Sequence, residues 1–277
     1  MNDSTPKSLG LIAGKGVYPR LLANSARKQG VERLFAVAFR GETDRVIEKY
    51  VDEVAWLHLG QLGALLEAFR KSGMTKAVMV GQITPTHLFR LRLDRVALSV
   101  LSQLKERNAE TIFGAVGDEL RKVGVELMPA SMFMEHTMPE PGVLTARAPT
   151  DEEKADIELG LKVAKTTSGL DIGQTVVIKR GTILAVEAFE GTDAAILRAG
   201  KLGGAGAVVV KVAKQGHDMR FDIPVIGEHT LKSLRRAGAT AMAVEARRTI
   251  LLDREEIVRL ADRHGLCIVA AEFNRAG

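Results

Sequence analysis

Cysteine is nearly absent from this chain of 277 residues, since Cys267, in the apolar stretch LCIVAA, is the only one. A lone cysteine excludes an intramolecular disulfide framework and a cysteine-rich zinc site, and we expect it to serve as a small buried apolar side chain. Aromatic residues are also scarce, at 4%. Few aromatic rings argue against a surface that stacks on nucleic-acid bases, so we expect no nucleic-acid partner.

Long apolar runs are missing as well. The first residues, MNDSTPKSLGLIAG, contain no extended apolar segment of the kind found in a secretory signal. No uninterrupted apolar stretch approaches the roughly 18 residues that a bilayer-spanning helix needs. We therefore expect a cytoplasmic protein without a membrane span.

Several common catalytic motifs do not occur. None of the six histidines forms an HxH or HxxxH pair, and HExxH is absent, which argues against a zinc site. The serine-hydrolase motif GxSxG and the Walker loop are missing too.

The composition that remains is that of an ordinary globular protein, with 46% hydrophobic and 26% charged residues. The formal net charge of +5 is mild, and the Lys and Arg residues are scattered. This balance fits a preference for anionic ligands or an anionic membrane surface, without requiring a DNA-binding face. The length suits one large or two ordinary domains.

The first half of the chain alternates short apolar runs with amphipathic stretches. The apolar runs are LGLIAG, RLFAVAF, EVAWLHLG and KAVMVGQI, and the stretches with helical spacing include YPRLLANSARKQG, DRVIEKY and QLGALLEAFRKSG. Strands that are apolar throughout, separated by amphipathic helices, indicate a parallel sheet covered on both faces. We expect a Rossmann-like α/β domain with a mostly parallel sheet over residues 1–135, with residues 86–124 helical and VELMPASMF closing the unit.

Residues 136–150, HTMPEPGVLTARAPT, contain three prolines and little apolar periodicity. Proline favours extended or turn geometry, so this segment is the best candidate for a linker. Residues 151–277 then predict a second α/β domain with a mixed sheet. It begins with a helix near residues 152–168, followed by two strands around the turn KRG.

Glycines mark a turn between the first predicted strand and its helix. The stretch GLIAGKGVYPR places Gly14 and Gly16 where backbone N–H groups at a helix start favour phosphate, and Lys15 adds charge. The spacing is not the dinucleotide fingerprint, and an ordinary tight turn explains it equally well. Gln82 ends another predicted strand, at the edge of the sheet where open α/β proteins bind ligands, but it also suits a polar loop.

Acidic residues gather in EAFEGTDAAI, where a predicted strand passes into a helix. Thr192 or Asp193 is a good helix N-cap, and capping alone explains one of them. Capping does not explain Glu187, at the end of an otherwise apolar strand.

The stretch KVAKQGHDMRFDIPVIG places Asp218, Arg220 and Asp222 at every second position. Pro224 disfavours helical geometry just before it, so an extended chain would put these three side chains on one side. Two carboxylates flanking a cation can bind a divalent ion and a phosphate oxygen, as Mg²⁺ prefers few carboxylates and completes its shell with water or phosphate. An Asp–Arg–Asp surface cluster worth under about 1 kcal/mol is the alternative.

A basic and apolar stretch, HLFRLRLDR, carries Arg90, Arg92 and Arg95 among leucines and a phenylalanine. It suits contact with a membrane surface or an acyl-bearing substrate. An amphipathic helix with a solvated face is the favoured interpretation.

Three of these stretches, LGLIAGKGVYP, VEAFEGTDAAI and KVAKQGHDMRFDIPVIG, in this order, resemble the UDP-2,3-diacylglucosamine pyrophosphatases of the LpxI type. The likeness runs from Leu9 to Phe273, and the last motif is the most specific. It implies a cytoplasmic homodimer of two α/β domains at the inner-membrane face of Gram-negative bacteria. This enzyme of lipid A biosynthesis would bind lipid between its domains. It would hydrolyse its lipid-linked UDP-sugar to UMP and 2,3-diacylglucosamine 1-phosphate (lipid X), with Mg²⁺ or another divalent cation.

The resemblance also implies roles for individual residues. Asp222 matches the family's essential aspartate, and Asp218 and Arg220 belong to the same catalytic motif. A divalent ion would be held by Asp222 and Glu187. The expected substrate-binding residues are Gly14, Lys15, Gly16, Gln82, Gly191, Thr192, Asp193 and Lys211. Whether Asp222 ligates the metal or orients the attacking water stays open.

Two rival functions remain beside this interpretation. A non-catalytic nucleotide- or lipid-binding protein would keep the glycine turn but release no UMP. A nucleotide-sugar transferase would also use metal and pyrophosphate contacts, yet it would require an acceptor other than water.

Overall fold

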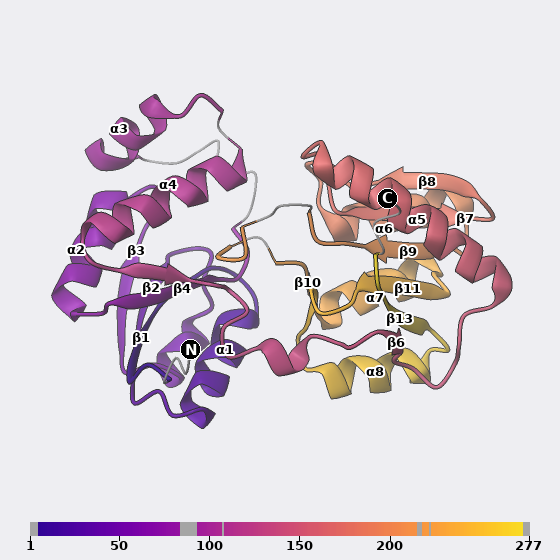
Figure 1. The fold of residues 1–277 in the computed structure, drawn as a ribbon, viewed down its shortest axis with the longest axis horizontal. Coiled ribbons are helices and arrows are strands. Elements are labelled where there is room, and N and C mark those ends of the chain that lie inside the picture. Colours follow the sequence, from indigo (N-terminus) through magenta and orange to yellow (C-terminus); the bar gives the residue numbers. More distant parts are fainter. Residues whose placement is uncertain (1–4, 84–92, 107, 215–217, 222, 274–277) are drawn as a thin grey trace. The chain divides into compact units, whose positions relative to one another are not determined.

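The computed structural model describes residues 5–83, 93–106, 108–214, 218–221 and 223–273. The chain divides into two compact units, each with its own sheet (Figure 1). Unit 1 comprises Met1–Met134 and Asp218–Asp222, and unit 2 comprises Glu135–His217 and Ile223–Gly277.

Unit 1 is built on a five-stranded parallel sheet in the order β3-β2-β1-β4-β5. The strands are β1 (Ser8–Ala13), β2 (Arg33–Phe39), β3 (Glu53–Leu57), β4 (Lys76–Val80) and β5 (Glu126–Met128). The chain steps outward from β1 to β3 and then crosses back to β4, so the strand order reverses between β1 and β4. The C-terminal ends of these two strands are the place where open α/β sheets bind ligands.

The helices of unit 1 cover both faces of this sheet. They are α1 (Tyr18–Lys28), α2 (Leu62–Ser72), α3 (Arg95–Gln103) and α4 (Ala109–Lys122), with a 3₁₀ helix at Arg45–Lys49. Right-handed crossovers that run in opposite directions place α1 and α2 on opposite faces. Phe69 of α2 is fully buried against one face, in a core that includes Phe35 and Leu120. In β1, Ile12 belongs to this core, and its neighbour Leu11, which points the other way, is fully buried on the opposite face.

Unit 2 contains a mixed six-stranded sheet in the order β6-β13-β11-β9-β7-β8. Parallel neighbours β9, β11 and β13 form its centre, and antiparallel pairs form both edges. The strands are β6 (Gly142–Val143), β7 (Thr175–Lys179), β8 (Thr182–Val186), β9 (Val208–Lys211), β11 (Ala241–Glu245) and β13 (Cys267–Ala271). A separate parallel pair is formed by β10 (Val225–Ile226) and β12 (Ile250–Leu251).

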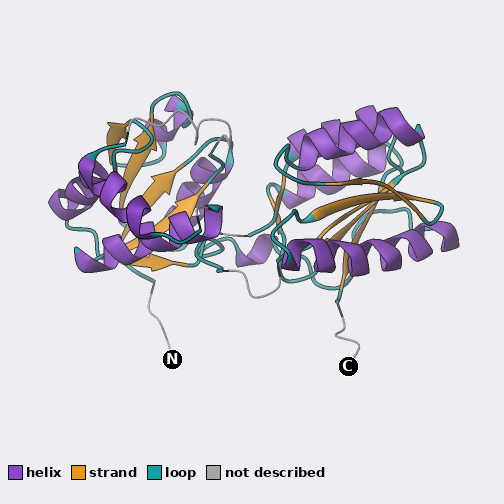
Figure 2. Ribbon diagram, turned by 90° about the horizontal axis from the view of Figure 1, so that it is seen from above, coloured by secondary structure: helices purple, strands orange, loops and turns teal. Residues whose placement is uncertain are grey.

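Helices also enclose the sheet of unit 2, as Figure 2 shows. They are α5 (Asp151–Gly169), α6 (Thr192–Gly203), α7 (Glu228–Ala237) and α8 (Arg254–Arg263). Helix α5 packs on one face, where Gly160 lies so close to Val210 that a Cβ atom would sit 2.4 Å from its Cγ2. Helices α6, α7 and α8 share the core of the other face. The predicted fold class, a parallel N-terminal sheet with a mixed C-terminal sheet, is confirmed.

Residues 136–150, the predicted linker, include a strand and side chains that are hydrogen-bonded within unit 2. Gly142–Val143 form edge strand β6 against β13, and Thr145 accepts a hydrogen bond from the Ile268 amide. Arg147 continues these contacts by pairing with Glu153 at 2.8 Å. Proline-rich sequence can follow a sheet edge because an edge strand needs few of its own N–H donors. This segment is therefore an ordered strap on unit 2.

The helical region expected over residues 86–124 contains two helices, α3, which ends at Gln103, and α4, which begins at Ala109. Asp94 caps the first through the Ala97 amide, and Asn108 caps the second through the Thr111 amide. Arg90 and Arg92 lie outside the described residues. Arg95 is the first residue of α3.

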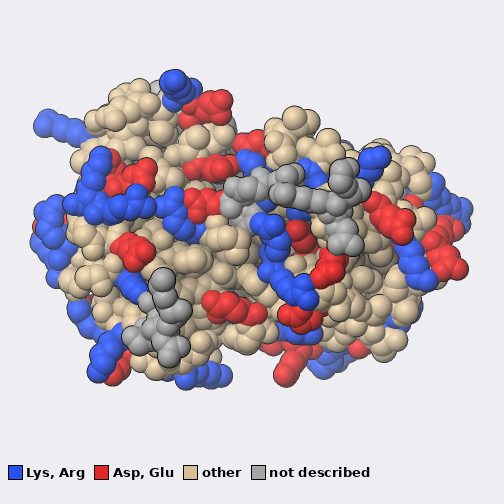
Figure 3. All heavy atoms as spheres, in the orientation of Figure 1, with Lys and Arg blue, Asp and Glu red and all other residues tan. Residues whose placement is uncertain are grey.

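Two surface properties bear on the predicted surroundings of the chain. Among the described residues, no helix combines the length and the apolar character that crossing a bilayer requires. On the face drawn in Figure 3, acidic and basic side chains are interspersed.

Candidate functional site

The ends of β1 and β4 in unit 1 are joined by backbone contacts. The Gly14 amide donates to the Val80 carbonyl at 2.8 Å, and Lys15 exchanges two hydrogen bonds with Gln82, of 2.7 and 3.0 Å. A Cβ atom on Gly14 would lie 2.6 Å from the Gln82 carbonyl oxygen. Close backbone approach therefore requires glycine at position 14.

This geometry changes the expected role of the glycine turn. The amides of Gly14 and Lys15 donate to β4 and its loop, so they are not free to bind a phosphate. Gly16 has a φ of 94°, which favours glycine, and it is exposed at the start of α1 together with the Lys15 side chain. Lys15 and Gln82 thus lie together at the C-terminal ends of β1 and β4, with Gly16 next to Lys15, and the substrate-binding role of all three stays a prediction.

In unit 2, six polar side chains meet where β9 ends and α6 begins. Lys211, the last residue of β9, donates from Nζ to the Thr192 hydroxyl at 3.0 Å, and Thr192 donates to Glu187 Oε1 at 2.9 Å. Asp193 Oδ2 lies 2.7 Å from His229 Nδ1. We call this group the α6 cluster; its members are Thr175, Glu187, Thr192, Asp193, Lys211 and His229.

The start of α6 explains why these side chains are available. Gly191 is the N-cap residue with a φ of 84°, and no side chain caps the helix. Thr192 and Asp193 were each expected as a possible N-cap, and that expectation is wrong, because both already lie within the first turn. Their side chains instead reach Lys211, Glu187 and His229.

Two buried carboxylate oxygens in the α6 cluster lack hydrogen-bond donors. Glu187 Oε2 and Asp193 Oδ1 are inaccessible to solvent and have no partner among the described residues. A buried acceptor without a donor costs roughly 1–3 kcal/mol, so these atoms call for a donor or a cation. The ammonium of Lys211 supplies positive charge to the same cluster. A sugar hydroxyl, a base N–H or a divalent ion would each supply the partner that these two oxygens lack.

The Asp218–Phe221 segment differs from the extended strand that the alternating pattern predicts. The Phe221 amide donates to the Asp218 carbonyl at 3.2 Å, which closes a turn, and Asp218 Oδ1 accepts from the Arg220 amide at 3.0 Å. The Asp218 carboxylate also forms a two-pronged ion pair with Arg220, with Nε at 2.9 Å from both oxygens. These hydrogen bonds raise the pKa of Arg220.

This turn packs on unit 1, although most of the neighbouring sequence belongs to unit 2. The second domain, predicted over residues 151–277, therefore does not include this segment, which belongs to unit 1. Asp222 lies outside the described residues, so its expected roles as catalytic group and metal ligand stay predictions. Asp218 and Arg220 are brought together, as expected for one motif, but as an ion pair within a turn.

The donors for a divalent ion are few. Among the residues that the structure describes, no three His, Cys, Asp or Glu side chains gather in a way that could hold a metal. Mg²⁺ needs only one or two protein carboxylates when a substrate phosphate supplies further oxygens. The unpartnered Oε2 atom of Glu187 fits such a ligand.

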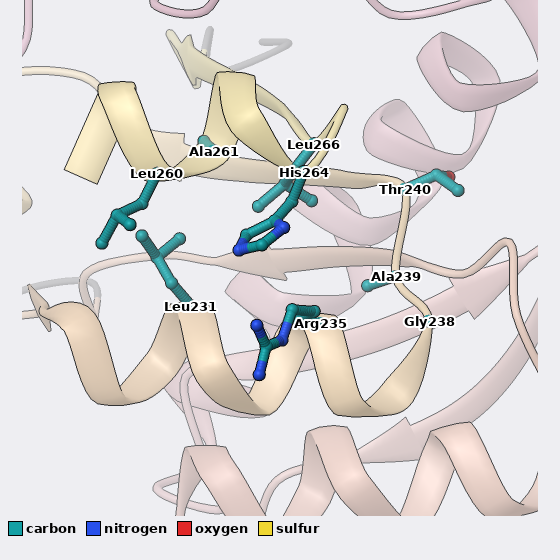
Figure 4. Close-up of a pocket in the computed structure, with 9 residues that line it drawn as sticks. All are labelled: Leu231, Arg235, Gly238, Ala239, Thr240, Leu260, Ala261, His264 and Leu266. Atoms are coloured by element: carbon teal, nitrogen blue, oxygen red, sulfur yellow. The ribbon is translucent and has the colours of Figure 1, made fainter. Parts of the chain in front are cut away.

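A small cavity of about 250 Å³ lies elsewhere in unit 2, between α7 and α8. Figure 4 shows His264 facing the helix that carries Leu231 and Arg235. Two residues that line the cavity, Thr240 and Leu266, directly precede β11 and β13. The cavity therefore lies at the N-terminal ends of those strands. The α6 cluster lies at the opposite edge, where β9 ends.

Two members of the α6 cluster were not foreseen from the sequence. Thr175 faces Thr192 with 3.4 Å between their hydroxyl oxygens, and His229 contacts Asp193 from the first turn of α7. His229 has no motif partner nearby in the sequence, because its contact spans 36 residues. The sheet register reveals Thr175, since it lies opposite Lys211.

Both units are α/β folds that present polar side chains at the C-terminal ends of parallel strands, which is the arrangement of ligand-binding α/β proteins. The LpxI N-terminal domain model matches residues 8–137, and the LpxI C-terminal domain model matches residues 140–269. The chain is 34% identical, over 279 aligned residues, to the UDP-2,3-diacylglucosamine pyrophosphatase LpxI of Caulobacter vibrioides. That alignment covers 96% of this chain and 98% of the relative. The chain belongs to the LpxI family.

Two solved structures share a distant similarity with this chain. N5-carboxyaminoimidazole synthetase from Staphylococcus aureus in complex with ADP is 15% identical, with a TM-score of 0.25. The match covers 63% of this chain and 38% of the synthetase. The crystal structure of gox2253 is 13% identical, with a TM-score of 0.30, and the match covers 94% of this chain and 83% of that one. Similarity this low carries no functional argument.

Proposed function

We propose that this chain hydrolyses the pyrophosphate bond of UDP-2,3-diacylglucosamine, a step of lipid A biosynthesis. Family membership supports the proposal, because both domain models match and the Caulobacter relative carries this activity in its name. The expected products are UMP and 2,3-diacylglucosamine 1-phosphate.

The structural observation that carries the proposal is the α6 cluster with its two buried carboxylate oxygens that lack a partner among the described residues. A nucleotide-linked sugar offers hydroxyl and N–H donors that match Glu187 Oε2 and Asp193 Oδ1. Lys211 adds an ammonium that can take a phosphate oxygen as a point charge. One cluster therefore matches both the neutral and the anionic parts of such a substrate.

The reaction needs a water molecule and charge neutralisation. The water oxygen forms a bond to the phosphorus next to the diacylglucosamine, the bridging P–O bond breaks, and UMP leaves with the bridging oxygen. Asp222 would take the water proton or help to hold an ion. Arg220 uses Nε and Nη2 on Asp218, which leaves Nη1 outside that ion pair as a donor for a phosphate oxygen.

A divalent cation, normally Mg²⁺, completes the proposal. Glu187 would hold it together with phosphate oxygens and water. Bound there, such an ion withdraws negative charge from the diphosphate. We further propose a cytoplasmic homodimer that contacts the inner membrane peripherally, since its substrate carries two acyl chains.

The test is an incubation of the purified chain with UDP-2,3-diacylglucosamine in ¹⁸O-labelled water, followed by ³¹P NMR and mass spectrometry. We expect UMP without label and 2,3-diacylglucosamine 1-phosphate with one ¹⁸O atom. EDTA should stop turnover and added Mg²⁺ should restore it. Full activity in EDTA would remove the metal from the proposal.

The same incubation separates the rival functions. A binding protein would retain the substrate and release no UMP. A nucleotide-sugar transferase would form product only after an acceptor is added. Either result would overturn the hydrolase proposal.

A further inference from the structure

The turn at Asp218–Phe221 is held on unit 1 by three contacts that involve no ligand. The Ala130 amide donates to the Met219 carbonyl at 2.8 Å. The Phe221 ring lies 5.8 Å from the Phe113 ring of α4, centroid to centroid, and packs against the core of unit 1. One backbone bond and one aromatic contact thus fix the two ends of the turn.

The third contact depends on an absent side chain. A Cβ atom at Gly117 of α4 would lie 3.1 Å from Arg220 Nη1 and 3.3 Å from Leu127 Cδ2. Both distances are shorter than most contacts of a real Cβ atom, so a larger residue would displace the guanidinium or the core leucine. Glycine costs a helix interior about 1 kcal/mol relative to alanine, so its presence here needs another reason.

A second glycine in α4, Gly114, shows that crowding is not general along this helix. Gly114, one turn earlier, has no atom of the described residues within 4 Å of its Cβ position. Space is therefore limited at Gly117, where Arg220 lies, and open at Gly114. The two positions form a matched pair on one helix.

We propose that Gly117 is a positioning residue for the hydrolysis: its missing side chain leaves the space on α4 in which Arg220 lies. Phe113 anchors the turn beside that space. The inference rests on the proposed function, because Arg220 and the Asp222 that follows Phe221 in the sequence are its expected catalytic groups. A displacement of about 1 Å at a reacting group can cost 10²-fold in rate.

The test compares Gly117→Leu with Gly114→Leu in the full chain. We expect Gly117→Leu to lower kcat by about 10²-fold with little change in KM, because it displaces a group expected to act in the reaction and alters no residue of the α6 cluster. Gly114→Leu should keep kcat near that of the unaltered chain. Wild-type kcat in Gly117→Leu would overturn the inference.

Hydrogen exchange supplies a readout that does not depend on activity. Gly117→Leu should speed exchange in the peptides that contain Ala130 and Phe221, while those of β1 and β4 stay protected. Unchanged exchange at both peptides would also overturn the inference. Inactivity of the unaltered chain would instead remove the proposed function, and exchange would still report whether Gly117 seats the turn.

Variants with smaller changes keep the test decisive if Gly117→Leu does not fold. Gly117→Ala adds only the Cβ atom, and Phe113→Ala weakens the anchor without filling the space. Phe113→Ala should raise exchange at Phe221 and lower kcat, and Phe113→Leu should restore most of the loss by replacing the apolar contact. Gly117→Ala, whose Cβ atom needs a shift of only a few tenths of an ångström, should have a smaller effect in the same direction. Normal kcat and exchange in both variants would contradict the proposal.

Discussion

The hydroxyl of Thr192 lies between the ammonium of Lys211 and the carboxylate of Glu187. It accepts from Lys211 Nζ at 3.0 Å and donates to Glu187 Oε1 at 2.9 Å. The hydroxyl thus connects a strand end, a helix start and a loop carboxylate. With Oε1 occupied in this way, Oε2 is the oxygen that stays open.

Replacing Thr192 with valine removes this connection while keeping the shape of the side chain. A hydrogen bond to a charged group contributes about 1.5–3 kcal/mol, so we expect kcat/KM to fall roughly 10- to 100-fold. Thr192→Ser keeps the hydroxyl and should retain most of the activity. Steady-state kinetics with UDP-2,3-diacylglucosamine measures both variants. Equal activity of Thr192→Val and the unaltered chain would exclude the connection from function.

Asp222→Ala should abolish activity without unfolding the chain. Loss of a general base or a metal-bound carboxylate typically lowers the rate by about 10²–10⁴-fold. Circular dichroism and the Tm should match those of the unaltered chain. Glu256→Ala, which removes an exposed carboxylate paired with Arg259 on α8, is the control and should turn over normally. An active Asp222→Ala variant would sink the assignment.

The fold was largely predictable because its signals are local. Strands β1, β2 and β4 are apolar after their first residue, which marks a sheet covered on both faces. The hairpin turn at KRG was also predicted from sequence. In the structure Arg180 and Gly181 are its two central residues, with φ values of 50° and 74°. Such two-residue turns require positive φ at both central positions.

The Asp218–Phe221 turn was not predictable from alternation. Its conformation depends on the Asp218–Arg220 ion pair and on Phe113, which is more than 100 residues away in the sequence. Contacts of this range override a local strand pattern. The α6 cluster was unpredictable for the same reason. Gly191 is the N-cap residue of α6, so Thr192 and Asp193 do not cap the helix and instead contact residues distant in the sequence.

Glu153, at the start of α5, should make stability depend on acid. Burial alone would raise its pKa, but hydrogen bonds from Arg147 and from the Thr150 amide outweigh burial and lower the pKa to about 2. A carboxyl with a depressed folded-state pKa stabilises the fold above its unfolded pKa of about 4.5. This stabilisation, at most about 3 kcal/mol, should be lost as the pH falls from 4.5 towards 2.

Urea unfolding at pH 7, 4 and 3 measures this effect. Glu153→Gln should lower the midpoint at pH 7 and flatten its fall between pH 4.5 and 3. Glu158→Gln alters an exposed carboxylate later in the same helix and should leave the profile unchanged. An acid profile of Glu153→Gln that matches that of the unaltered chain would remove Glu153 as the source.

Among the salt bridges of the described residues, the pair of Lys165 and Glu245 is the most deeply buried. Nζ lies 2.6 Å from Glu245 Oε2, and the two side chains are 8% and 7% exposed. Both also bind the backbone of Ala213, just after β9: Nζ donates to its carbonyl and Oε2 accepts from its amide, each at 2.8 Å. Burial lowers the pKa of Lys165, and its hydrogen bond to Glu245 opposes that shift.

Removing one partner should be more harmful than removing both. Glu245→Gln leaves a buried ammonium without its counter-charge and should destabilise the chain by about 3–5 kcal/mol. The double variant Lys165→Met, Glu245→Gln removes that uncompensated charge and should recover part of the loss. Chemical denaturation of the single and double variants gives the coupling energy. If the losses of unfolding free energy in the two single variants simply added in the double variant, Lys165 and Glu245 would not stabilise each other. Each side chain would then contribute only through its own hydrogen bond to Ala213.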